Sequence, residues 1–160
     1  MLLKDNELAT VLHADLRRPA SVLDHQRTRE LLDFTEPVAL LMCAVLHFIP
    51  DEDGPLEIIA AYRETLCPGS FLAISHATDD HYPTETSAAA DLYKDTKTPG
   101  TLRTYEEIAR FFNGFTLVDP GLVYTPLWRP EPGIATADPR QSLCYGGVAR
   151  LGNPSITDAG

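Results

Sequence analysis

Two histidines, His47 and His76, directly follow segments that we expect to form neighbouring strands of one sheet. An imidazole has a pKa near about 6.5, so either side chain could accept a proton from a substrate hydroxyl or amine. If the strands are neighbours, both rings can face the same crevice at the edge of the sheet. We therefore predict that His47 and His76 are catalytic. At each position, the alternatives are a buried, hydrogen-bonded histidine or a surface histidine.

Metal binding is another chemistry that residues of this region allow. Nitrogen and oxygen ligands could come from four side chains: His47, His76, Asp79 and His81. Their spacing matches no established ligand pattern, so we expect no metal site. Three widely spaced cysteines lack a CxxC pair and fit neither a zinc site nor a disulfide framework: Cys43, Cys67 and Cys144. Unpaired cysteines favour a cytoplasmic location.

The composition indicates a globular protein with few nucleic-acid-binding features. The chain has 160 residues, enough for one domain at most, with 44% hydrophobic and 22% charged residues. Its net charge is −10, which disfavours nucleic acid and anionic membranes as partners. The longest apolar run, residues 38–46, is shorter than the roughly 20 residues of a membrane span.

The elements that position the histidines form a strand–helix–strand unit. Residues 38–46 are continuously apolar, which is typical of a parallel strand covered on both faces. An acidic turn, residues 51–53, precedes Pro55, which suits the first position of a helix. Cys67-Pro68-Gly69 then predicts the end of that helix, and residues 70–75 predict the second strand.

The flanking segments predict further elements of an α/β fold. Upstream, we expect a short strand over residues 10–13 and a helix over residues 21–33 with Ser21 as its N-cap. Downstream, Thr104 and Glu107 form a capping-box pattern at the start of a helix that Asn113-Gly114 ends. The remaining expectations are a helix over residues 85–94, strands over residues 115–118 and 143–151, an irregular loop over residues 120–140, and a flexible tail over residues 152–160.

Together, several segments resemble the actinobacterial S-adenosylmethionine-dependent methyltransferase family that was once catalogued as a domain of unknown function. The matching residues are 11–19 (VLHADLRRP), 37–54 (PVALLMCAVLHFIPDEDG), 66–78 (LCPGSFLAISHAT), 108–121 (IARFFNGFTLVDPG), 128–130 (WRP) and 145–148 (YGGV). The resemblance implies an α/β, partial Rossmann-like methyltransferase fold with a mostly parallel sheet and an antiparallel C-terminal strand. Residues 1–151 would form the C-terminal portion of a single methyltransferase domain, without its first two strands and glycine-rich turn.

The same resemblance implies a cofactor site for S-adenosylmethionine and a small-molecule methyl acceptor. Asp15 matches the position whose carboxylate accepts a hydrogen bond from the adenine amino group, and Leu16 would pack against the ring. The alternative is that Asp15 only caps a turn. Backbone groups at the end of the fourth strand of the family fold would also contact the cofactor, because ligands of open α/β sheets bind there: Ala44, Val45 and Leu46.

A methyltransferase without its first two strands would expose residues 38–46 as an apolar edge strand. Such an edge promotes association, so we expect a truncated family member that forms homo-oligomers, or a non-catalytic remnant that binds another chain through this edge. A misassigned start codon is a further reading. A nucleotide-binding protein of another kind, such as an NAD-dependent enzyme, is the weakest reading, because the sequence contains no GxGxxG turn.

Overall fold

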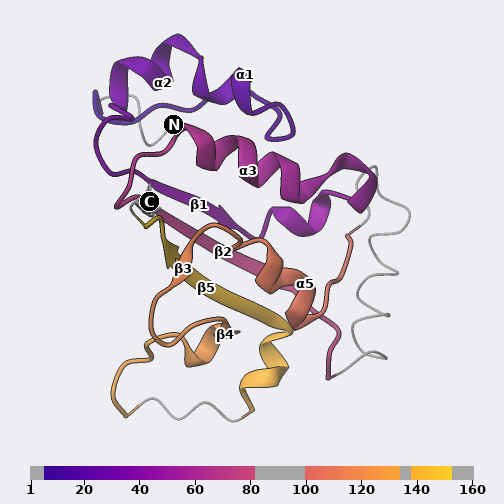
Figure 1. Cartoon of the computed structure of the whole chain (residues 1–160). Coiled ribbons are helices and arrows are strands. Elements are labelled where there is room, and N and C mark those ends of the chain that lie inside the picture. The colour runs from indigo at the N-terminus through magenta and orange to yellow at the C-terminus, as the bar shows by residue number, and fades with distance from the viewer. Residues whose placement is uncertain (1–5, 82–99, 134–137, 153–160) are drawn as a thin grey trace, which may run out of the picture.

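The computed structural model describes residues 6–81, 100–133 and 138–152, which form an open α/β arrangement (Figure 1). Its five-stranded sheet has the order β1-β2-β5-β3, and β4 also pairs with β5. The strands are β1 (Ala39–Cys43), β2 (Phe71–Ala77), β3 (Thr116–Leu117), β4 (Val123–Tyr124) and β5 (Cys144–Arg150).

The strand directions confirm a mostly parallel sheet with an antiparallel C-terminal strand. β1 and β2 are parallel, whereas β5 pairs antiparallel with β2, β3 and β4. β5 therefore runs against the other four strands. In the part of the chain that is described, β1 lies at one end of the sheet order, so the expected edge position of this strand is confirmed.

The helices cover one face of the sheet and its β1 side (Figure 1). They are α1 (Pro19–Leu23), α2 (Gln26–Leu31), α3 (Pro55–Thr65) and α5 (Tyr105–Arg110), with short 3-10 turns η1 (Leu46–Phe48) and η2 (Asp51–Asp53) between β1 and α3. η3 (Thr125–Leu127) and η4 (Pro139–Ser142) lie before β5. No helix among residues 6–81, 100–133 and 138–152 is long and apolar enough to cross a membrane.

The core lies between α3, α5 and one face of the central strands. On β2, the alternate residues Leu72, Ile74 and His76 are buried, while Phe71 is 37% exposed. The helices contribute large apolar side chains to the same cluster, including Ile58, Ile59, Ile108, Phe111 and Phe112. This alternation gives β2 a buried face and a partly solvent-facing one. On β1, Ala39, Leu41 and Cys43 are exposed, so the expectation that residues 38–46 are covered on both faces does not hold for the described residues.

The strand–helix–strand prediction is confirmed, and the reasons are local. Gly54 adopts φ +64° directly before Pro55, and Gly69 adopts φ +93° between α3 and β2. Glycine adopts positive φ without the steric cost that other residues carry. At α5, Thr104 and Glu107 form the predicted capping box. The strand expected over residues 38–46 is shorter and ends at Cys43, because Ala44 adopts a left-handed φ of +51°.

Two predictions near the N-terminus are wrong. Residues 10–13 are not a strand, because no described segment pairs with their backbone. The helix expected over residues 21–33 is split into α1 and α2, and Ser21 lies inside α1 instead of capping it. The split occurs where the His25 ring accepts a hydrogen bond from the Arg27 amide and so caps α2.

Other expectations meet the structure only in part. The loop expected over residues 120–140 contains the short strand β4, and the helix α5 ends before Asn113-Gly114, although Gly114 adopts the left-handed φ of +87°. The helix expected over residues 85–94 lies outside the described residues, as does the tail beyond residue 152.

Candidate functional site

The carboxyl ends of β1 and β2 lie side by side, and the chain turns sharply after β1 at Ala44. Ala44 adopts φ +51°, a left-handed conformation that alanine rarely adopts. Its amide donates hydrogen bonds to the carbonyl of Ser75 (3.1 Å) and to Ser75 Oγ (2.9 Å), which hold the turn against β2. Ala44 is exposed. A strained surface turn at this edge of an open α/β sheet is a recurrent feature of ligand sites.

Val45 and Leu46 follow Ala44 into the protein. The Leu46 side chain is fully buried, and its carbonyl accepts hydrogen bonds from the Ile49 amide and from Nη1 of Arg103. Val45 is half-buried, and its carbonyl accepts from the Phe48 amide. The predicted backbone contacts at residues 44–46 therefore fit Ala44 best, because the carbonyls of the next two residues are used inside the turn.

His47 and His76 are neighbours, as their positions after adjacent strands suggest. Their ring centroids lie 5.6 Å apart, and the rings are nearly perpendicular. His47 comes from η1 and His76 from β2. The two rings differ sharply in burial and in hydrogen bonding, so they are suited to different roles.

His76 is fully buried, and both of its ring nitrogens are engaged. Nδ1 lies 2.7 Å from the Ala77 carbonyl and donates to it, so Nε2 accepts from Nη1 of Arg103 at 2.9 Å. Burial is the main cause that lowers the pKa of His76 to about 4; the charge of Arg103 acts in the same direction, and the backbone hydrogen bond to Ala77 opposes it. His76 is therefore neutral at pH 7 and has the features of the buried, hydrogen-bonded alternative, which do not support a catalytic role.

His47 retains an unused nitrogen. Its Nδ1 atom is buried and has no hydrogen-bond partner among the described residues. Burial lowers the pKa of His47, and the nearby Arg103 charge adds to this effect. Its backbone carbonyl accepts from the Thr101 amide at 2.6 Å, which fixes the residue in place. A buried polar atom without a partner requires an explanation, and a bound ligand is one.

Asp15 lies in a turn that the structure ties to the start of α3. Its Oδ1 accepts a hydrogen bond from the Arg17 amide, and the Arg17 guanidinium binds both carboxylate oxygens, at 2.7 Å for the shortest contact. Arg17 also donates to Asp53 at 2.9 Å. These hydrogen bonds to Arg17 lower the pKa of Asp15 to about 2, so the carboxylate is ionised at neutral pH.

Asp15 therefore caps a turn, which was the alternative reading, and remains a partly exposed acceptor. Its side chain is 40% exposed. Next to it, Leu16 is half-buried against the core, and its carbonyl accepts from the Tyr62 hydroxyl at 3.3 Å. Tyr62 belongs to α3, and Asp53 lies in η2 shortly before this helix. The Asp15 turn is therefore anchored to the segment that follows the Ala44 turn.

Arg103 is a residue of this region that sequence reasoning missed. It is only 4% exposed, and its guanidinium lies beneath η1 and η2. An isolated arginine before a capping box carries no sequence signal, because its partners lie far away along the chain. Its contacts are with Leu46, Ile49, Asp51 and His76.

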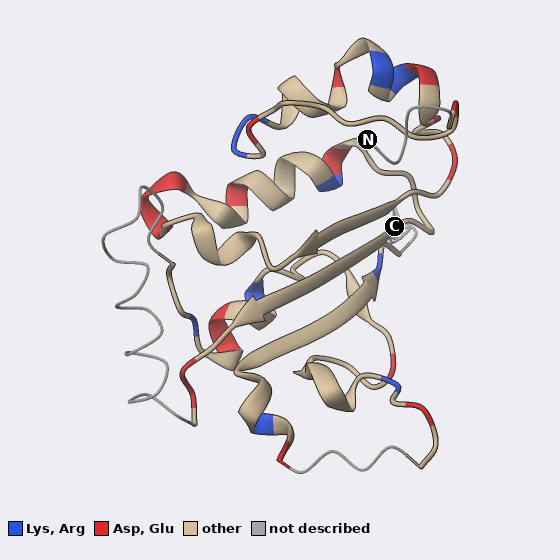
Figure 2. Ribbon diagram, turned by 180° about the vertical axis from the view of Figure 1, so that it is seen from behind, with Lys and Arg blue, Asp and Glu red and all other residues tan. Residues whose placement is uncertain are grey.

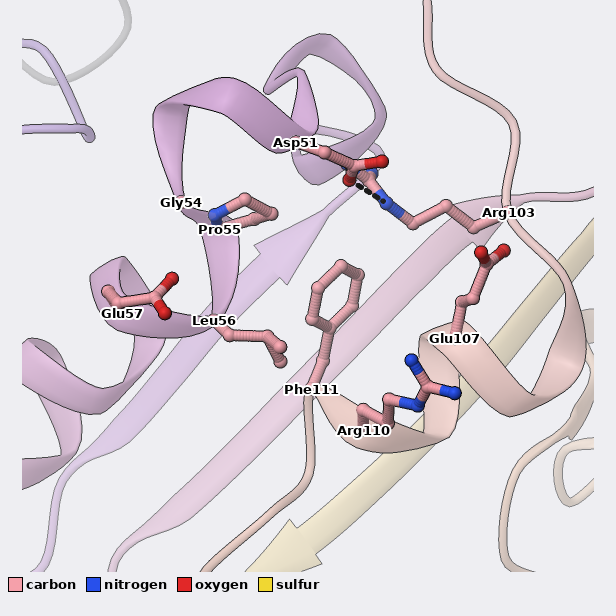
Figure 3. Close-up of a pocket in the computed structure, with 9 residues that line it drawn as sticks. All are labelled: Asp51, Gly54, Pro55, Leu56, Glu57, Arg103, Glu107, Arg110 and Phe111. Carbon is pink, nitrogen blue, oxygen red and sulfur yellow. Dashed lines mark hydrogen bonds and ion pairs between the residues drawn. The ribbon is translucent and has the colours of Figure 1, made fainter.

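A separate pocket of about 290 Å³ opens between the start of α3 and α5 (Figure 3). Arg103 and Asp51 form its upper rim, and Phe111 extends into it, with the Arg103 guanidinium 5.3 Å from the Phe111 ring centre. The remaining lining residues are Gly54, Pro55, Leu56, Glu57, Glu107 and Arg110. None of the residues predicted from the sequence to form the site lines this pocket.

The described residues contain no cluster of side chains that could hold a metal ion. No three carboxylate, thiol or imidazole groups there come together as metal ligands. In the described residues, acidic positions occur mainly on the helices and loops, and arginine positions are interspersed among them (Figure 2).

Comparison with known proteins identifies the family. Residues 1–152 match the family model described as S-adenosyl methyltransferase. The crystal structure of a DUF574 family protein from Streptomyces avermitilis MA-4680 is 40% identical, with a TM-score of 0.81, and the alignment covers 88% of this chain and 53% of that one. A candidate methyltransferase from Thermobifida fusca YX is 33% identical, with a TM-score of 0.86, and the alignment covers 94% and 57%.

The chain thus spans little more than half the length of these two solved relatives. No curated protein matches it. The family match extends over nearly the whole chain, and the fold agrees with both solved structures. This chain therefore belongs to the S-adenosyl methyltransferase family, whose cofactor is S-adenosylmethionine.

Proposed function

We propose that this chain takes part in the transfer of a methyl group from S-adenosylmethionine to a small-molecule acceptor. The observation that carries the proposal is the strained, exposed turn at Ala44, which lies at the carboxyl edge of the sheet. The Asp15 turn is anchored to the segment that follows it. Family membership supplies the reaction class.

The residues present fit the adenosine part of the cofactor. We propose that the Asp15 carboxylate accepts from the adenine amino group, because it is ionised and half-exposed. We propose that Leu16 offers an apolar surface beside it, and that the exposed backbone at Ala44, which precedes Val45 and the buried Leu46, also contacts the cofactor. When bound, S-adenosylmethionine supplies an activated methyl group on its sulfonium, so the protein mainly has to position the reactants.

We propose His47 as the residue that accepts or holds the proton of the acceptor group. Its Nδ1 atom has no partner among the described residues, and its lowered pKa keeps the ring neutral at pH 7. A neutral imidazole can accept a proton or a hydrogen bond from a hydroxyl or amine. His76, with both nitrogens engaged, supports the site by packing against the His47 ring.

For partners, we propose a small molecule in preference to nucleic acid or an anionic membrane, because the net charge is −10. A cytoplasmic location remains a prediction. Homo-association through the β1 edge also remains a prediction; it is supported by the 65% exposure of the Leu41 side chain on that strand. Sedimentation velocity of the wild type and of Leu41→Lys would test it, since only the wild type should associate.

Titration calorimetry with S-adenosylhomocysteine tests the cofactor site. We expect Asp15→Ala to weaken binding at least about tenfold, the effect of losing one charge-assisted hydrogen bond. Asp33→Ala is the matched control, because Asp33 also caps a turn through its carboxylate, at Thr35. Binding that is unchanged by Asp15→Ala would refute the assigned role, and no binding by the folded wild-type chain would refute the proposed function of this chain.

A further inference from the structure

We propose that Arg103 is a positioning residue for the candidate site, acting through the turn that carries Ala44 and His47. This inference rests on the proposed function, because it concerns the same turn. Arg103 forms no hydrogen bond with Ala44 or His47 in the described contacts, so we do not place it among the groups that would contact the reactants. It binds the backbone on both sides of His47, at Leu46 and Ile49.

All five N–H donors of the Arg103 guanidinium are used. Four of the five bonds go to the short connection between β1 and α3, and the fifth goes to His76 on β2. The acceptors are the Leu46 carbonyl (3.2 Å), the Ile49 carbonyl (2.8 Å), Asp51 Oδ1 (3.2 Å from Nε and 2.7 Å from Nη2) and His76 Nε2 (2.9 Å). One side chain thus fixes both ends of the connection and ties it to the neighbouring strand.

The backbone of the connection has other hydrogen bonds as well. The Ala44 amide donates to the Ser75 carbonyl, and within η1 the His47 carbonyl accepts from the Thr101 amide. The Phe48 and Ile49 amides donate over short range to Val45 and Leu46. Arg103 links this segment to residues more than 50 positions away along the chain. Together with these backbone bonds, the guanidinium therefore holds the segment against β2, and with it the His47 ring.

The burial of Arg103 makes this arrangement sensitive to its exact side chain. The residue is 4% exposed, and its carboxylate partner Asp51 has a side chain that is 77% exposed. A planar guanidinium can serve acceptors in several directions at once, whereas a lysine ammonium offers three donors from one point. Arg103→Lys keeps the positive charge but loses the planar arrangement of donors. It therefore separates the effect of hydrogen-bond geometry from the effect of charge.

Hydrogen exchange followed by NMR tests the positioning role independently of ligand. In Arg103→Lys, we expect amides of residues 44–49 to exchange about tenfold faster or more, the effect of losing one to two buried hydrogen bonds. Amides of β5 should be protected as in the wild type. Arg63→Lys is the matched control, because Arg63 also bridges two elements, through the Asn113 carbonyl, at the far end of α3. Acceleration spread evenly over the protein would overturn the proposal.

A second variant keeps the test decisive if Arg103→Lys does not fold. Asp51→Asn removes the charge partner and retains the shape, and it should accelerate the same amides by a smaller factor. An unchanged exchange pattern in Asp51→Asn, together with an unfolded Arg103→Lys, would indicate a purely structural arginine and overturn the proposal.

Calorimetry with S-adenosylhomocysteine tests whether the positioning by Arg103 affects cofactor binding. If the wild type binds, Arg103→Lys should weaken binding at least about tenfold, while Arg63→Lys should bind as the wild type does. Equal binding by wild type and Arg103→Lys would overturn the positioning role and leave the proposed function intact. Absence of binding by the wild type would refute the proposed function, and the exchange experiment would still decide the role of Arg103.

Discussion

Nη1 of Arg103 lies 2.9 Å from Nε2 of His76, so a permanent buried cation faces a histidine that must stay neutral. Protonation of His76 would place a second positive charge in the same buried space. The His47 ring packs edge-on against His76 and further disfavours its protonation. The negative charge of Glu107 acts in the opposite direction and favours protonation.

This contact predicts a loss of stability in mild acid. His76 has a pKa of about 4 in the folded protein, against 6.5 for a free histidine. Between these values the unfolded chain binds more protons, so the free energy of unfolding falls as the pH falls through this window, by up to about 3 kcal/mol. The lowered pKa of His47 acts in the same direction.

Thermal unfolding between pH 7 and pH 4 measures this effect. His76→Gln removes the titrating group while offering an amide oxygen to Arg103, so its stability should depend less on pH over this range. A pH dependence in His76→Gln equal to that of the wild type would contradict the assignment.

The turn at Ala44 predicts that a glycine substitution there does not destabilise the protein. Ala44 adopts φ +51°, where an alanine side chain is strained and glycine is not. We expect Ala44→Gly to be neutral or to raise the free energy of unfolding by up to about 1 kcal/mol. Ala39→Gly, at an exposed position of the extended strand β1, should lower it by about 0.5–1 kcal/mol. Urea unfolding compares the two, and equal losses would argue against strain at Ala44.

The position of Gly114 predicts that an alanine there lowers the free energy of unfolding, through backbone strain and steric crowding. It adopts φ +87°, and an added Cβ would meet the Arg63 guanidinium, which donates to the Asn113 carbonyl at 2.7 Å. Gly114→Ala should therefore cost more than about 1 kcal/mol. Gly121→Ala is the control, because Gly121 has a similar φ of +91° and open space around it. Thermal unfolding should rank Gly114→Ala as the less stable; the reverse order would refute the role of Arg63.

The capping box at α5 predicts a loss of stability that depends on which residue replaces Thr104. Thr104 Oγ1 accepts from the Glu107 amide, and the Glu107 carboxylate accepts from the Thr104 amide at 2.8 Å. Thr104→Ala should lower the free energy of unfolding by about 1 kcal/mol, whereas Thr104→Ser keeps the hydroxyl and should stay near the wild type. Denaturant unfolding distinguishes them, and similar losses in both variants would show that the cap contributes little.

Parts of the candidate site were predictable because they follow from the strand–helix–strand unit. The neighbouring positions of His47 and His76 follow from two parallel strands, whose carboxyl ends meet at one edge. The difference between the two rings did not follow. It depends on Arg103, which lies 27 residues from His76 and gives no local pattern.

The sequence by itself determined the strand–helix–strand unit around α3 and the capping box of α5, because turn residues and apolar patterns act over a few positions. The reversed direction of the last strand was implied by the family resemblance. Only the tertiary structure decided that residues 10–13 remain unpaired, that Arg17 joins the Asp15 turn to Asp53, and that Arg103 joins Leu46 across 57 positions. Pairing and burial of polar groups depend on which distant segments come into contact, and no local pattern of residues encodes that choice.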